Sequence, residues 1–332
     1  MPGVAPADHS VDMESVATPA RTVSARTLAG LAVGLVVSGV FLWLAVRNAD
    51  VDVVLDELGD ARLAPVLAAV VVLFAGYALQ AARWRRIADT PSLGWRRFYG
   101  MVLGGLACNN VLPVRIGELL RARWLSTDAP MPGGRALGTI ALDRACDVVT
   151  LALFLAVGIN VVASPGWLVR MAVGAAVLVV LIAAALVFAR QYARRRPRAR
   201  RARRRVRRIV RDTIETLAEP IGRRHAATWL ALSIGTWSLG TVAVVLVARS
   251  VGIDLSPLEA VFVSAALALG VAIPSSPGYV GTYQWVGVAS LGLLDVPVNE
   301  ALAFTILMQA SWYVPTTLAG GAFLGVRALR GR

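Results

Sequence analysis

The sequence contains no lysine, only two cysteines and two histidines, and only 16% of its 332 residues are charged. Cys108 and Cys146 stand at no metal-ligand spacing, and His9 and His225 have no ligand residue beside them. These absences argue against a zinc or haem site, and we expect neither metal nor cofactor. A basic leader is missing too, so residues 1–26 are predicted to be a disordered cytoplasmic tail rather than a secretory signal.

Apolar sequence is abundant. Hydrophobic residues make up 57% of the chain and its mean hydropathy is +0.66, well above the usual range of soluble domains. A bilayer core of about 30 Å requires roughly 20 apolar residues per spanning helix. Six segments meet that requirement: 28–46, 63–82, 138–162, 168–189, 226–249 and 301–325. The sequence therefore predicts an all-α polytopic membrane protein.

Two further apolar regions are too short or too interrupted to span a bilayer. Each consists of two segments separated by a break rich in proline and glycine, which is typical of a re-entrant hairpin whose irregular backbone is buried in protein. The paired segments are 98–112 with 116–125, and 258–273 with 279–294. The residues predicted to form the turns are Pro113, Gly117, Pro277, Gly278 and Gly281. Both breaks share a proline followed four positions later by a glycine.

Arginine collects in cytoplasmic loops and so tests the topology. Residues 190–224 hold 15 arginines and three acids, which supplies +12 of the net charge of +14. Arg83 and its neighbours are interpreted as loop arginines after the second span. With both hairpins re-entrant, every arginine-rich segment and both termini lie in the cytoplasm, as expected for a multi-pass protein of a bacterial-type inner membrane.

The same topology divides the chain into two halves of opposite orientation. Each half consists of two spans, a hairpin and a third span, in that order. Residues 27–165 form the first repeat, 166–326 the second, and 327–332 a cytoplasmic tail. Inverted repeats with broken helices at matching positions are typical of secondary transporters, which bind their substrate near the membrane midplane. We expect no nucleic-acid partner, and the sequence leaves open whether the protein forms a homo-oligomer.

Within the basic segment 190–224, apolar residues recur at helical spacing opposite the arginines. This pattern predicts an interfacial amphipathic helix that attracts anionic headgroups. The simpler interpretation is that the segment only fixes the topology.

The first hairpin carries ionisable and amide groups in a segment otherwise apolar enough to enter the membrane. These are Asn109, Asn110, Arg115, Glu118 and Arg121. Charged groups at membrane depth are costly and are usually kept for a partner or a substrate. Because arginine binds phosphate through a planar pair of donors, we predict that this group binds an anionic headgroup. The alternative is that the arginines are ordinary anchors at the cytoplasmic interface.

Two other groups are candidates. Arg144 and Asp147 lie on the third predicted span beside Asp143, where they either contribute to the substrate site or form a structural ion pair. The second hairpin offers Ser276, Tyr283 and Gln284, and its freed backbone N–H groups suit an anion. For this hairpin the alternative is a purely structural turn. The nearby Trp285, Trp312 and Tyr313 are interpreted as aromatic belt residues.

Three stretches in order, NNVLPVRIGELLRARWLS, LDRACDVV and IPSSPGYVGTYQ, resemble the signature regions of the flippase-like family, also named for the lysylphosphatidylglycerol synthase transmembrane region. The resemblance covers roughly residues 28–325 and implies a lipid-flippase-like membrane domain without the aminoacyl-transferase domain of bifunctional members. By residue, the resemblance supports ten positions across the three motifs: Pro113, Arg115, Gly117, Glu118, Arg121, Arg144, Asp147, Pro277, Gly278 and Gly281. The third motif departs from the family pattern, P-G-G-x-G-x-x-E, at Tyr279 and Gln284.

The leading hypothesis is a non-enzymatic transporter of an anionic or modified phospholipid, or of a polyprenyl-phosphate-linked lipid, with membrane lipids as its partners. A scaffold of envelope synthesis is the main alternative. An intramembrane enzyme using Glu118, Asp143 or Asp147 as a general base is less well supported.

Overall fold

The computed structural model describes residues 25–112, 116–161, 205–219, 222–271 and 277–330, together with the single positions 174 and 191. Every regular element in these residues is helical, which confirms the all-α class. The long helices are α1 (Ala25–Val46), α3 (Leu63–Ala88), α6 (Gly133–Gly158), α9 (Arg223–Ser250) and α12 (Val298–Arg330). The shorter ones are α2 (Val51–Asp60), α4 (Trp95–Val111), α5 (Gly117–Asp128), α8 (Arg205–Ala218), α10 (Pro257–Gly270) and α11 (Thr282–Gly292), with 3-10 turns η1 (Ile159–Val161) and η2 (Pro277–Tyr279).

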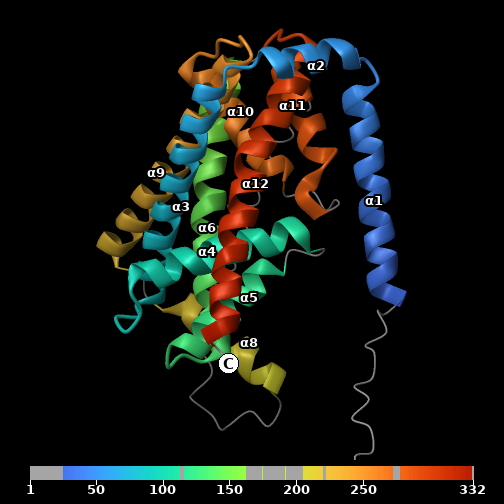
Figure 1. Ribbon diagram of the computed structural model, residues 1–332. Helices are drawn as coiled ribbons and strands as arrows, with labels where there is room; N and C mark the ends of the chain where they lie inside the picture. Colours follow the sequence, from blue (N-terminus) through green and yellow to red (C-terminus); the bar gives the residue numbers. More distant parts are fainter. Residues whose placement is uncertain are drawn as a thin grey trace, which may run out of the picture.

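Helices α3, α6, α9 and α12 run along the length of a bundle, and α3 packs against α9 (Figure 1). In the described part of the chain, α3 and α9 are long and apolar enough to cross a bilayer by length and composition. The predicted spans 28–46, 138–162 and 301–325 also coincide with the long helices α1, α6 and α12. The predicted span 168–189 lies almost wholly outside the described residues. The count of six spans therefore stays a prediction.

Each short-helix pair folds back on itself where the sequence predicts a hairpin. α4 and α5 lie in the lower half of the bundle in Figure 1, whereas α10 and α11 lie in the upper half. In the first pair, the amide of Gly117 donates to the side chain of Asn109 over 2.8 Å, and a Cβ on Gly117 would lie only 2.1 Å from the carbonyl oxygen of Gly105. The two helices can therefore meet only because residue 117 has no side chain. Pro113 lies outside the described residues.

The second pair turns through η2. Gly278 and Gly281 adopt φ angles of +76° and +89°, which only glycine adopts without strain. A Cβ on Gly281 would lie 2.2 Å from the backbone oxygen of Ser38 in α1, so this glycine also allows α1 to approach the turn. Pro277 begins η2, as the predicted turn requires.

The ends of the bundle differ in composition. α2 lies across the upper end in Figure 1 and contains four acidic residues. It is capped by Asp50, whose side chain accepts from the amide of Asp52 over 3.0 Å. α8 lies at the lower end and packs against the start of α6, where Thr213 donates to the carbonyl oxygen of Gly134 over 2.9 Å. The predicted basic helix is thus present and attached to the bundle. Most of the arginine run before it lies outside the described residues.

Arg83 differs from its sequence interpretation. It lies inside α3, which continues to Ala88, six residues past the predicted span, and its side chain is completely buried. An arginine there is tolerated because α6 supplies two carboxylates. It is therefore part of the interior and not a loop arginine.

Candidate functional site

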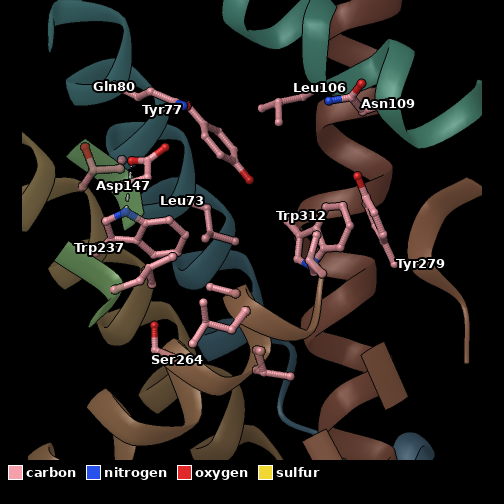
Figure 2. A pocket seen from close by; sticks show the side chains of 18 of the residues that line it. Leu73, Tyr77, Gln80, Leu106, Asn109, Asp147, Trp237, Ser264, Tyr279 and Trp312 are labelled. Carbon is pink, nitrogen blue, oxygen red and sulfur yellow. Dashed lines mark hydrogen bonds between the residues drawn. The ribbon is translucent and has the colours of Figure 1, made fainter. Parts of the chain in front are cut away.

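A cavity of about 400 Å³ lies at the centre of the bundle, where the two hairpins meet α3, α6, α9 and α12. Figure 2 shows its two walls: Tyr77, Asp147 and Trp237 lie on one side, and Asn109, Tyr279 and Trp312 on the other. Much of the remaining lining is aliphatic, for example Leu267 and Val244. A mostly apolar cavity with a few polar groups at one end is the usual form of a small-molecule site.

A buried ion-pair network forms the polar end. The guanidinium of Arg83 lies 2.8 Å from Asp143 and 2.8 Å from Asp147, which stand one turn apart on α6. Ser233 of α9 accepts a further hydrogen bond from Arg83 over 2.6 Å, and Trp237 donates to Asp147 over 3.1 Å. Three helices are thus joined through one arginine. Arg144 and Asp147 form an ion pair on α6, as one of the two sequence interpretations proposed. The principal partner of both aspartates, however, is Arg83.

Two more arginines complete the network. Arg121 of α5 reaches Asp143 at 3.3 Å and lies 4.2 Å over the ring of Trp84, so its charge is used inside the protein. Arg144 lies 3.2 Å from Asp143 and 3.2 Å from Asp147. Three arginines and two aspartates give these five residues a formal charge of +1. Glu118 lines the same end of the cavity and brings the formal charge to zero, so an anion would be bound through the exposed part of Arg144 and not through an excess of positive charge.

Arg144 is the arginine of this network that a ligand can reach. It lines the cavity and its side chain is 41% exposed, against 0% for Arg83 and 5% for Arg121. Its Nε is buried and has no hydrogen-bond partner among the described residues. A buried donor without a partner is costly, but a ligand can contact only the exposed remainder of the Arg144 side chain.

The first hairpin contributes Glu118 to the same end of the cavity. Its two carboxylate oxygens accept from the amide of Asn109 over 3.2 and 3.1 Å. Asn110 lines the cavity as well, but its amide donates to Thr317 of α12 over 2.8 Å and fixes the hairpin to that helix. Arg115 lies outside the described residues, so its predicted role is neither supported nor opposed by the geometry.

The second hairpin places its candidates differently. Tyr283 lines the cavity. Gln284 does not: its side-chain oxygen accepts from the amide of Gly281 over 2.8 Å, and its nitrogen donates to Gln309 of α12. Gln309 in turn donates to the carbonyl oxygen of Gly278 over 2.6 Å, which closes a chain of amides around the turn. Ser276 lies outside the described residues.

Sequence reasoning missed the aromatic part of the wall. Trp312 was expected in an interfacial belt, yet it lines the cavity beside Tyr279, with Tyr77 facing it from α3. Their sequence signal is weak, because the pattern around a single aromatic residue in an apolar helix does not distinguish a belt residue, a core residue and a cavity residue. Trp285, by contrast, packs 4.8 Å from the ring of Phe41 and is absent from the cavity lining.

The fold and the cavity define a helical membrane protein with a charged site in its interior. Residues 31–320 match the family of the lysylphosphatidylglycerol synthase transmembrane region, and the chain belongs to this family. It is also similar to the protein named glycosyltransferase AglD of Haloferax volcanii, at 26% identity over 330 residues. That match covers 86% of this chain and 53% of the relative, so the chain spans about half of the relative's length.

Proposed function

We propose that the protein moves a lipid with an anionic headgroup between the two leaflets of a bacterial-type cytoplasmic membrane, without changing the lipid chemically. In this proposal the chain crosses the membrane six times with both termini in the cytoplasm, and its halves form an inverted repeat. The placement of α4–α5 and α10–α11 at opposite ends of the bundle supports that arrangement.

The observation that carries the proposal is the position of Arg144. It is a cation within the bundle whose side chain is 41% exposed and lines the cavity together with residues of both hairpins. A charged group in such surroundings is usually retained for function. A phosphate oxygen accepts charge-assisted hydrogen bonds from a guanidinium, and these are roughly twice as strong as neutral ones.

The size and polarity of the cavity suit a headgroup rather than a whole lipid. About 400 Å³ is near the lower end for small-molecule sites, and the acyl chains would stay in the bilayer. Glu118 belongs to the first hairpin and Tyr283 to the second, so a movement of either hairpin changes the shape of the site. Alternating movement of the hairpins would then expose the headgroup to one side at a time.

The test is a leaflet-redistribution assay in proteoliposomes with fluorescent phosphatidylglycerol and, for comparison, fluorescent phosphatidylcholine. We expect the native protein to move phosphatidylglycerol, and Arg144→Gln and Glu118→Gln to lower that rate about tenfold, as the loss of one charged hydrogen bond predicts. Arg123→Gln, which changes an exposed arginine of α5, is the matched control and keeps the native rate. Unfolding midpoints check that each variant is folded.

The same vesicles distinguish the alternatives. Mass spectrometry of the recovered lipid shows an unchanged mass for a transporter and an altered mass for an enzyme. A scaffold neither moves nor modifies lipid, and that result would contradict the proposal. The name of the relative suggests glycosyl transfer, but it describes a protein about twice as long as the matched region.

A further inference from the structure

Tyr279 has a backbone conformation that tyrosine rarely adopts. Its φ is +62°, in the left-handed region, where a residue with a Cβ is strained. Its neighbour Gly278, at φ +76°, adopts the same region without that cost. The turn would therefore form more easily with glycine at position 279, and the strain points to a use for the tyrosine side chain.

The ring of Tyr279 forms part of the cavity wall. It is 92% buried, and its centroid lies 6.2 Å from the ring of Trp312, which in turn lies 5.8 Å from Tyr283. All three rings line the cavity, and the hydroxyl end of Tyr279 points toward the first hairpin, on the side of Asn109 (Figure 2). The strained residue thus belongs to an aromatic wall that connects the second hairpin to α12.

We propose that Tyr279 is a specificity-determining residue of the cavity and that the site takes a headgroup in which a phosphate is joined to a polyhydroxylated ring. An aromatic wall presents flat apolar faces, and these match the C–H face of such a ring better than a bare phosphate or a flexible chain. The carboxylate of Glu118, which Asn109 holds in place, has further lone pairs that are suited to ring hydroxyls. Arg144 is the partner of the phosphate.

This inference rests on the proposed function for the identity of the ligand as a lipid, but it is tested by binding, which does not require transport. The probes are water-soluble dihexanoyl phosphatidylinositol and dihexanoyl phosphatidylglycerol. They carry the same charge, and only the first has a ring. We expect the native protein in detergent to bind the inositol lipid about 3- to 10-fold more tightly, the gain typical of one aromatic contact.

Three variants separate ring contact from packing. Tyr279→Phe keeps the ring and the preference for phosphatidylinositol. Tyr279→Ala and Tyr279→Gly both lose the preference, with phosphatidylglycerol affinity changed less than twofold. Glycine relieves the backbone strain that alanine keeps, so the unfolding midpoint of Tyr279→Gly should exceed that of Tyr279→Ala by about 2 °C or more. A purely structural tyrosine predicts instead that binding follows stability, with the glycine variant binding better than the alanine variant.

Each result has a distinct meaning. Equal binding of both lipids by the native protein, or an unchanged preference in Tyr279→Gly, would overturn the assignment of Tyr279. Selective binding without redistribution in vesicles would contradict the transport proposal and leave the assignment of Tyr279 standing. If the native protein binds neither lipid, both the assignment of Tyr279 and the transport proposal are overturned.

Discussion

Arg83 of α3 and Asp143 of α6 form an ion pair in which both side chains are fully buried, with Nε and Nη2 of the arginine each 2.8 Å from the same carboxylate oxygen. Removing two charges from water is costly, and their mutual attraction offsets that cost only while both partners are present. The pair therefore makes α3 and α6 depend on each other.

Asp143→Ala should be severely destabilising. It removes a negative charge from beside Arg83 and Arg121 in the interior. The loss of one partner of a buried ion pair typically costs about 3–5 kcal/mol of stability. Thermal unfolding in detergent measures the effect. Asp56→Ala on the exposed face of α2 is the control and should change stability by less than about 0.5 kcal/mol. Similar losses in both variants would show that the network contributes little.

Gly117→Ala should disrupt the first hairpin. Its Cβ would stand 2.1 Å from the carbonyl oxygen of Gly105, so α4 and α5 must move apart, and strain of this kind typically costs 1–3 kcal/mol or more. Gly133 is a matched control, because it is also the first residue of its helix and a Cβ there meets no atom within 4 Å. The unfolding midpoints of Gly117→Ala and Gly133→Ala should therefore differ clearly. Equal midpoints would contradict the described packing.

The sequence predicted the helical segments well because their signal is local. Apolar runs bounded by Pro113, Gly117, Pro277 and Gly281 were sufficient to predict both hairpins. The role of Arg83 was missed, since its burial depends on carboxylates 60 and 64 residues away in the sequence. Gln284 was placed in the binding site, but its amide is bonded to Gly281 and Gln309 instead. Such pairings are set by tertiary contacts that local patterns do not contain.

Asp128, at the end of α5, fixes the first hairpin to the end of α12. Arg327 approaches both of its oxygens at 2.8 Å and Arg97 approaches at 2.7 Å. Burial alone would raise the pKa of Asp128, but the hydrogen bonds from Arg327 and Arg97 outweigh it and hold the pKa below the ordinary value of 3.8. The interaction is therefore complete at neutral pH and is lost as the pH falls below that value.

The native protein should accordingly lose stability relative to Asp128→Asn as the pH is lowered. At neutral pH the native protein should have the higher unfolding midpoint, and the difference should shrink toward about pH 3. Unfolding midpoints of both proteins across this range provide the measurement. If the difference in unfolding midpoint does not change with pH, the contact of Asp128 with Arg97 and Arg327 does not depend on the charge of the carboxylate.

The central claim, that lipid headgroups pass through the cavity, is tested most directly by filling it. Gly240 of α9 lines the cavity, and a Cβ there would meet no atom within 4 Å, so Gly240→Phe places a ring in the open space. Gly325→Phe, at an equally open position of α12 that does not line the cavity, is the control. In the redistribution assay we predict that Gly240→Phe abolishes movement of phosphatidylglycerol while Gly325→Phe retains it. Native-rate movement by a folded Gly240→Phe protein would contradict the account.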